Sequence, residues 1–337
     1  MRSTARLPGR VLVTGAGGFA ARPLLARLAE VVDPDAGHVA LFGPSGADAP
    51  AALPACFRPE ACDLVMPGAI DAIVGSAKPD IILHLAAQSS VSASLTGGAE
   101  RTWDVNLFGT RQLAEAVTRH VPAATLLFAS TVEVYGLAFR SGRLDETAAT
   151  APQNPYARSK RAAEDLLLDT LPASTRLIIT RMTNHSGPGQ AAQFVLPSFA
   201  RQIAQIEAGQ AEPVLHVGNL DAERDFLHVE DVIEAELALL MAAPGLAHRT
   251  YNIASGAPTP IRALLDKMLA QARIPIEIRI DPARLRPSDI PRVDVDPGRL
   301  MAETGWRPAV SLDQLVTDIL ADQRRQTGSQ TGFSTGH

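Results

Sequence analysis

The sequence predicts an α/β protein whose main part is a doubly wound parallel sheet. Short apolar or β-branched runs alternate with stretches of helical apolar spacing, and a glycine-rich turn follows the first run. The 337 residues suffice for about two domains, and 46% apolar residues can supply a sizeable core. We therefore expect a smaller, interleaved α/β domain beside the sheet.

Composition argues against several classes of function. A net charge of -5 without clusters of Lys or Arg argues against nucleic acid as a partner. No apolar run approaches the roughly 20 residues of a membrane span, and the basic residues 1–10 lead into a strand. We expect no membrane partner and a cytoplasmic location. Cys56 and Cys62, with no Cys/His cluster, predict two buried reduced thiols and no metal site.

The first expected strand is 10–14 (RVLVT), and 22–32 has the apolar spacing of a helix. The turn between them suits a dinucleotide, because Gly15 permits a tight bend and Gly18 lets the backbone approach a pyrophosphate at the helix N-terminus. Ala21 takes the third glycine position, where a small residue still allows close packing. Such a turn alone is also typical of plain structure, but its place in the alternating series favours a Rossmann-type domain. The candidate cofactor residues here are Gly15, Gly17, Gly18, Phe19 and Ala20.

The second expected strand, 38–42 (HVALF), ends without an acidic residue for a ribose hydroxyl or an adjacent Arg for a 2′-phosphate. The residues therefore leave both NADP(H) and NAD(H) open as cofactor. After a loop over 44–54, Asp63 and Leu64 follow a third strand and are candidate contacts of the adenine side. An exposed Asp at a strand end is an equal alternative.

The next strand, 79–85 (PDIILHL), is almost continuously apolar, as is typical of a parallel sheet covered on both faces. His84 within it is expected to be a packed core histidine. Small residues follow the strand and would let the nicotinamide side of a cofactor lie close to the backbone. Leu85, Ala86 and Ala87 are therefore candidate cofactor residues, and Gln88 is a candidate substrate residue.

A helix over 103–117, with Asn106 near its start, precedes a buried strand over 124–129. That strand delivers 130–136 (STVEVYG) at its carboxyl end, the edge at which open α/β sheets bind ligands. The Thr131 hydroxyl at this edge can hydrogen-bond a carbonyl oxygen.

Tyr156 and Lys160 are four residues apart and share one face of a predicted helix over 156–171, which Asn154 is suited to cap. An ammonium beside a phenol favours phenolate, which would lower the tyrosine pKa from its usual value of about 10. The spacing alone is typical of any surface helix. Together with the glycine turn and Thr131, it indicates proton transfer to a carbonyl or alcohol handled with a nicotinamide.

These motifs resemble the extended short-chain dehydrogenase/reductase family, whose members act on nucleotide sugars, over about residues 10–323. Later segments are similar to the GDP-4-dehydro-6-deoxy-D-mannose reductase family, which reduces a C4 ketone to give GDP-D-rhamnose. The segments that carry the resemblance are the glycine turn, 130–136, the Tyr-x-x-x-Lys helix, 181–185 (RMTNH), 187–190 (GPGQ), 194–209, 217–226 and 281–289.

The resemblance implies a GDP-linked 6-deoxy-4-ketohexose as substrate and a homodimer. Hydride would pass to the sugar C4 while Tyr156 protonates the oxygen, Thr131 fixes it, and Lys160 tunes Tyr156 and holds the nicotinamide ribose. In the related GDP-mannose 4,6-dehydratases a Glu at the position of Glu133 removes a C5 proton, so a dehydratase remains the alternative. A 6-deoxytalose-forming reductase, another nucleotide-sugar epimerase or dehydratase, and a non-catalytic nucleotide-binding protein are lesser alternatives.

Several arginines in the second half suit a diphosphate, because a guanidinium offers forked donors. Arg201 lies on an amphipathic segment, 195–208, and the Asp289 carboxylate can accept from a ribose hydroxyl or from guanine. Without the resemblance, each Arg is also compatible with a surface salt bridge. The residues that the resemblance places in the substrate pocket are Asn184, Arg224, Arg286 and Asp289.

The predicted domains are interleaved. Residues 1–183 form an NAD(P)-binding Rossmann domain, to which 227–257 returns, and 184–226 and 258–323 form mainly the substrate domain. Residues 327–337, rich in Gly, Ser and Thr, are predicted to be disordered.

Overall fold

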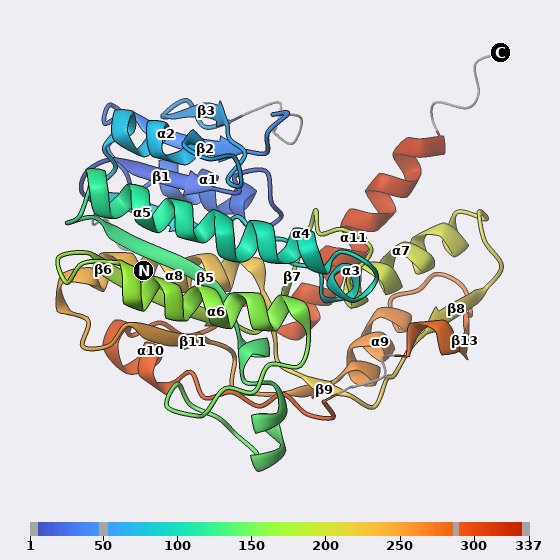
Figure 1. Ribbon diagram of the computed structural model, residues 1–337. Coiled ribbons are helices and arrows are strands. Elements are labelled where there is room, and N and C mark those ends of the chain that lie inside the picture. Colours follow the sequence, from blue (N-terminus) through green and yellow to red (C-terminus); the bar gives the residue numbers. More distant parts are fainter. Residues whose placement is uncertain (1–5, 47–52, 286–289, 332–337) are drawn as a thin grey trace.

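A seven-stranded parallel sheet forms the centre of the protein in a computed structural model that describes residues 6–46, 53–285 and 290–331 (Figure 1). The strand order is β11-β6-β5-β4-β1-β2-β3, which reverses direction between β1 and β4. The strands are β1 (Val11–Thr14), β2 (His38–Phe42), β3 (Phe57–Ala61), β4 (Ile81–His84), β5 (Thr125–Thr131), β6 (Arg176–Met182) and β11 (Thr250–Ile253). This arrangement confirms the predicted doubly wound, Rossmann-type sheet.

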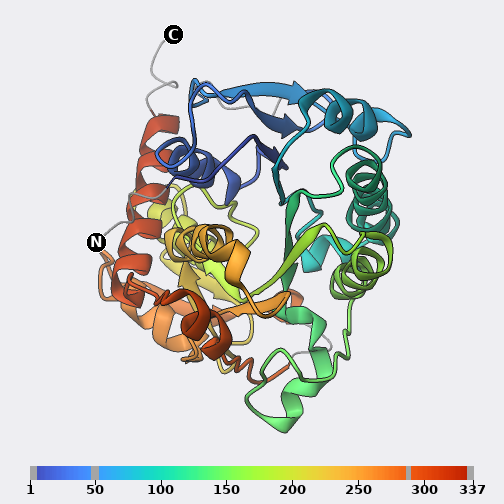
Figure 2. The same ribbon diagram turned by 90° about the vertical axis from the view of Figure 1, so that its left-hand side faces the viewer.

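Helices cover both faces of the sheet, as Figure 2 shows. One face carries α1 (Ala21–Ala29), α8 (Val229–Ala242) and α10 (Gly298–Thr304), and the other carries α2 (Ala69–Ala77), α5 (Thr110–His120) and α6 (Pro155–Thr170). Successive β1 side chains alternate between the layers, because Val11 and Val13 pack in the first and Leu12 in the second. Apolar side chains are therefore needed at every position of the strand, which explains its continuous apolar sequence.

A smaller unit with its own apolar core lies to the right in Figure 1. It contains α7 (Val195–Glu207), α9 (Ile261–Leu269), α11 (Leu312–Thr331), β8 (Val214–Val217), β9 (Glu223–Arg224), β12 (Thr259–Pro260) and β13 (Glu277–Ile280). Two more short strands, β7 (Asn184–Ser186) and β10 (Phe226–His228), pair in parallel between the sheet and this unit. The chain therefore crosses between the two cores more than once.

The segment between β4 and β5 is not the single helix expected over 103–117. It consists of α3 (Val91–Leu95), α4 (Ala99–Trp103), a π-helical stretch η1 (Asp104–Gly109) and α5. Two short 3₁₀ segments, η2 (Val132–Val134) and η3 (Gly136–Ser141), follow β5. A π-helix adds a residue to one turn, and such turns are frequent at functional sites.

The last helix extends further than the sequence indicates. Helix α11 continues to Thr331, so the first part of the segment predicted to be disordered, 327–337, is helical. The reason is packing: Thr327 lies one turn after Gln323, and both side chains are buried, at 6% and 4% exposure. Residues 332–337 are outside the described ranges.

Part of the segment assigned to the substrate domain packs instead on the sheet side. Leu300 of α10 and Trp306 belong to the same apolar cluster as α1 and α8. The Trp306 indole donates to the Asp231 backbone oxygen at 3.1 Å, which fixes this segment to α8. Within the described ranges, no helix is long and apolar enough to cross a membrane.

Helix α8 buries the side chain of Glu236, which is 3% exposed. Burial raises the pKa of Glu236 from 4.5 to about 8. Between pH 4.5 and about pH 8, Glu236 is protonated more often in the folded state than in the unfolded state. The contribution of Glu236 to the free energy of unfolding is therefore complete below about pH 4.5, and it is lost as the pH rises through about 8. The Glu236→Gln variant is expected to be more stable at pH 8.5, by on the order of 2 kcal/mol.

Urea unfolding of the two proteins at pH 5 and pH 8.5 measures this effect. Glu230→Gln on the exposed start of the same helix is the matched control, and it should change the free energy of unfolding by less than about 1 kcal/mol at either pH. An equal gain from Glu236→Gln at both pH values would contradict the expectation.

Candidate active site

The glycine turn lies against the carboxyl end of β4, at the point where the strand order reverses. Gly15 has φ +72°, and a Cβ there would come within 2.7 Å of the Ala86 backbone. Only glycine suits both the left-handed backbone and this close approach. Ala21, the first residue of α1, is 2% exposed and packs closely, as expected for the third small position. The turn therefore presents backbone N–H groups at a helix N-terminus, an arrangement that suits a pyrophosphate.

His84 at the end of β4 is a buried packing residue. Its Nδ1 lies 2.7 Å from the Thr14 hydroxyl and its Nε2 lies 2.9 Å from the Thr110 hydroxyl. The Ala86 N–H donates to the same Thr14 oxygen at 3.2 Å. Burial, and secondarily the charge of Lys160, lowers the pKa of His84 to about 3, so the ring is neutral. These contacts join β1, β4 and α5 directly below the glycine turn.

Asn106 is a residue of the site whose role the sequence did not reveal. The π-helical stretch directs it inward, where its Oδ1 accepts from the Gln88 N–H at 2.8 Å. Its Nδ2 donates to the Gln88 carbonyl at 3.2 Å and to the Ser159 hydroxyl at 3.0 Å. Because Ser159 stands between Tyr156 and Lys160, Asn106 ties the loop after β4 to the Tyr-Lys helix. Apolar spacing could not show this, since it does not reveal a π-helical turn.

Thr131 and Tyr156 meet at the carboxyl end of β5. The Thr131 side chain lies close enough to the Tyr156 phenol to lower its pKa, and Thr131 Oγ1 accepts from the Glu133 N–H at 3.2 Å. Helix α6 starts where the sequence indicates, because Asn154 Oδ1 accepts from the Ala157 N–H at 2.8 Å and so caps the helix. The cap fixes the first turn, and with it the phenol of Tyr156.

The pKa of Tyr156 differs from the sequence-based expectation. The pKa is raised to about 12, chiefly by burial; the Thr131 side chain lowers it and the charge of Glu133 raises it. The phenol therefore holds its proton at neutral pH. The ammonium of Lys160, expected to lower this pKa, is not directed at the phenol.

Lys160 is instead buried against β5. Its Nζ donates to the Ala129 carbonyl at 2.7 Å and lies 4.6 Å from the centre of the Phe128 ring. Burial lowers the pKa of Lys160 from 10.5 to about 7, and the nearby Glu164 carboxylate opposes that shift. A lysine whose pKa lies near 7 can change its protonation state when a cofactor binds beside it.

The remaining cofactor candidates lie at the same edge of the sheet. Asp63 and Leu64 lie just after the end of β3, and Leu85 and Ala87 lie in the loop after β4. Leu64 is 8% exposed, while Asp63 is half-buried and its Oδ1 accepts from the Val65 N–H at 3.2 Å. Because the strands are parallel, these positions lie at the same edge of the sheet as the glycine turn. That edge can hold an extended dinucleotide.

The substrate candidates are less closely grouped. Asn184 is exposed at the start of β7, and Arg224 in β9 donates to the Glu223 and Pro291 carbonyls at 2.9 and 3.5 Å. Arg201 lies on α7 in a cavity of about 190 Å³ formed with α11, and that cavity is lined by no residue of the glycine turn, β5 or α6. Arg286 and Asp289 lie outside the described residues.

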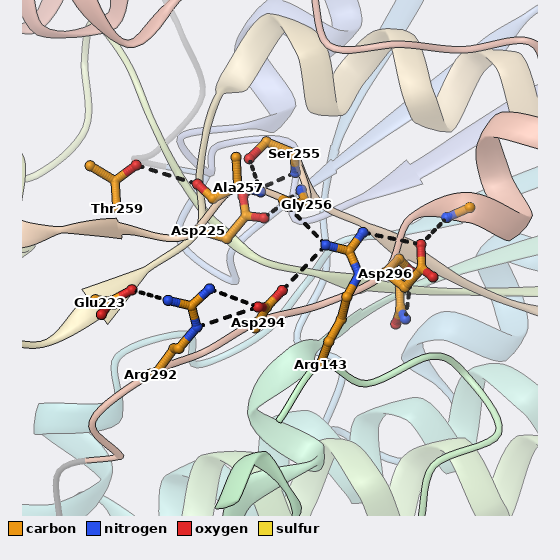
Figure 3. Close-up of polar contacts among 12 residues, drawn as sticks. Arg143, Glu223, Asp225, Ser255, Gly256, Ala257, Thr259, Arg292, Asp294 and Asp296 are labelled. Atoms are coloured by element: carbon orange, nitrogen blue, oxygen red, sulfur yellow. Dashed lines mark hydrogen bonds and ion pairs between the residues drawn. The ribbon is translucent and has the colours of Figure 1, made fainter. Parts of the chain in front are cut away.

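The strand carrying Arg224 is held by a polar cluster around Asp225 (Figure 3). Asp225, fully buried, accepts from the Ser255 and Gly256 N–H groups at 3.0 and 2.7 Å. Arg143 donates to the Gly256 carbonyl at 3.0 Å, and Arg292 bridges two acidic side chains beside it. The loop after β11 is thereby joined to β9 and β10, at the base of the smaller unit.

A Rossmann sheet with this glycine turn and with Thr131, Tyr156 and Lys160 at its carboxyl edge defines a nicotinamide-dependent enzyme of the extended short-chain dehydrogenase/reductase class. The chain belongs to the family described as GDP-mannose 4,6 dehydratase, whose profile matches residues 47–319.

Two curated relatives differ in their degree of similarity. A GDP-6-deoxy-D-mannose reductase from Pseudomonas aeruginosa is 36% identical over 93% of this chain and 96% of its own length. A GDP-mannose 4,6-dehydratase from Vibrio cholerae is 27% identical over 79% of each chain. Among solved structures, RMD from Pseudomonas aeruginosa complexed with NADPH has a TM-score of 0.79 at 32% identity, covering 95% of this chain and 100% of that one.

Proposed function

We propose that this protein reduces the C4 ketone of GDP-4-dehydro-6-deoxy-D-mannose to GDP-D-rhamnose with NADPH. The observation that carries the proposal is the similarity to a GDP-6-deoxy-D-mannose reductase along nearly the whole length of both chains. The choice of NADPH rests on the cofactor named for the similar RMD structure. Thr131 and Tyr156, which meet at the carboxyl end of β5, supply the polar groups that such a ketone requires.

In this proposal the bound nicotinamide supplies the hydride, and the protein supplies the proton and the orientation. The Tyr156 phenol, protonated because burial raises its pKa to about 12, donates to the developing alkoxide. The Thr131 hydroxyl hydrogen-bonds the same oxygen and fixes its position. Lys160 would hold the nicotinamide ribose, and its charge, one helical turn from Tyr156, would stabilise the phenolate left after proton transfer.

Glu133 favours one alternative, the dehydratase reaction. It is half-buried, and its Oε2 accepts from Asn154 Nδ2 at 3.4 Å, so a carboxylate stands close to the Thr131–Tyr156 pair. A reductase needs no base at this position. In our proposal the Glu133 carboxylate forms part of the pocket wall.

The Glu133→Gln variant separates the two reactions. A reductase is expected to keep its kcat within about threefold, because no proton leaves the sugar carbon, whereas a dehydratase loses its general base and at least about 100-fold in kcat. Steady-state assays with each substrate measure the difference. Thr131→Val sets the scale, because loss of its hydrogen bond to the oxygen should slow either reaction at least about tenfold.

Two assays run in parallel test the proposed function itself. With GDP-4-keto-6-deoxymannose the purified protein should oxidise added NADPH, and the nucleotide-sugar product should be GDP-rhamnose. With GDP-mannose and no added reductant it should consume nothing. Turnover of GDP-mannose, together with no NADPH oxidation by the keto sugar, would establish the dehydratase instead.

A further inference from the structure

Glu164 is a fully buried carboxylate on α6, one helical turn beyond Lys160. Both its oxygens are hydrogen-bonded. Oε1 accepts from the Ser130 hydroxyl and, at 3.1 Å, from Arg181 Nε. Oε2 accepts from Arg181 Nη2 at 2.6 Å and from Arg161 Nη1 at 3.0 Å. The guanidinium groups of Arg161 and Arg181 supply positive charge beside this enclosed carboxyl group.

These contacts fix the catalytic helix to two strands. Ser130 is the residue before Thr131 on β5, and Arg181 stands at the carboxyl end of β6. The Arg181 fork grips Glu164 with two parallel hydrogen bonds, a geometry that resists both sliding and rotation of the helix. The axial position of α6 determines where Tyr156 and Lys160 lie relative to Thr131.

The same carboxylate acts on Lys160 through its charge. Burial lowers the pKa of Lys160, and Glu164 is the charged group that raises it. The other titratable or charged groups around Lys160 are Tyr156 on the same helix, His84 on β4, and Arg161 and Arg181, which pair with Glu164. His84 is neutral, so Glu164 is the negative charge nearest to the ammonium in this set.

We propose that Glu164 is a positioning residue for Lys160. With Ser130 and Arg181 it fixes α6 at the ends of β5 and β6, and its negative charge keeps the buried ammonium protonated during turnover. This inference rests on the proposed function for the role of Lys160, but the geometry and the charge effect can be measured without any activity.

The chain offers a direct measurement, because its only lysines are Lys78, Lys160 and Lys267. Full-length protein labelled with ¹³C at lysine Cε should give three resolved signals, and Lys160→Met assigns the one of interest. In Glu164→Gln the titration midpoint of Lys160 is expected to fall by about one pH unit, because the attraction that opposes burial is lost. In Asp165→Asn it should stay within about 0.3 units, since that neighbouring carboxylate also pairs with Arg161 but is exposed.

A second pair of variants keeps the test decisive if Glu164→Gln does not fold. The double change Glu164→Gln with Arg181→Met does not leave the Arg181 guanidinium buried without its carboxylate, and it should still lower the Lys160 midpoint. Glu164→Asp keeps the charge and should restore the midpoint to within about 0.5 units of the unaltered protein. An unchanged midpoint in a folded Glu164→Gln protein, or an equal fall in Asp165→Asn, would overturn the proposal.

Kinetics then separate this inference from the proposed function. In Glu164→Gln the alkaline limb of the kcat profile should move to lower pH by the same amount as the Lys160 midpoint, with KM for the nucleotide sugar within about threefold. If the midpoint moves but the unaltered protein reduces no keto sugar, the proposed function is wrong and the positioning role stands. If the unaltered protein is active and the midpoint does not move, only the positioning role is wrong.

Discussion

Replacing Tyr156 by Phe is expected to lower kcat for reduction of the keto sugar by about 10²- to 10⁴-fold, the usual range for loss of a general acid. The ring would still fill its site on α6, so the fold and the affinity for NADPH should change little. Stopped-flow measurement of NADPH oxidation with saturating sugar, beside a fluorescence titration with NADPH, separates the chemical step from cofactor binding.

Tyr251→Phe is the matched control for that change. The Tyr251 phenol oxygen lies 3.0 Å from the His248 carbonyl and 2.8 Å from the Glu303 carboxylate, its two possible acceptors, in a cluster that contains none of the site residues. Its loss should cost about 1 kcal/mol of stability and leave kcat within about twofold. A Tyr156→Phe protein with undiminished kcat would contradict the assignment of this phenol as the proton donor.

Replacing Gly15 by Ala is expected to abolish NADPH binding. The new Cβ would stand 2.7 Å from the Ala86 backbone at a residue with φ +72°, so the turn must shift away from β4. The shift would displace the N–H groups that face the pyrophosphate, and we expect the Kd for NADPH to rise at least about 100-fold. Isothermal titration with NADPH measures the loss.

Gly37→Ala isolates the cost of the backbone conformation alone. Gly37 has φ +79°, close to that of Gly15, but no heavy atom lies within 4 Å of an added Cβ. This change should cost about 1 kcal/mol of stability and leave NADPH binding intact. Equal binding by the Gly15→Ala and Gly37→Ala proteins would show that close approach to Ala86 is not required.

Much of the sheet could be predicted from sequence because its local signals agree with its tertiary structure. The strand 38–42 matches β2 residue for residue, and the cap at Asn154 defines the start of α6. Continuous apolar runs in the strands directly reflect burial on both faces. The carboxyl edge of a parallel sheet then places Thr131 near Tyr156, because topology brings together residues that are distant in sequence.

The features that sequence could not give depend on where side chains point. Four-residue spacing puts Lys160 on the same face as Tyr156, yet its ammonium reaches back to the Ala129 carbonyl. The inward position of Asn106 depends on one π-helical turn. Arg201 has the charge that a diphosphate needs, and it lines a cavity with residues of α11 rather than with the glycine turn. Propensity and periodicity do not encode such orientations.

Transfer of deuterium from NADPH labelled at its transferable C4 position tests the proposed reduction most directly. After a single turnover with GDP-4-keto-6-deoxymannose, mass spectrometry and NMR should find one deuterium at C4 of a GDP-rhamnose product, with one NADPH oxidised for each sugar reduced. A product without deuterium at C4, or GDP-mannose consumed with no net oxidation of NADPH, would contradict the proposal.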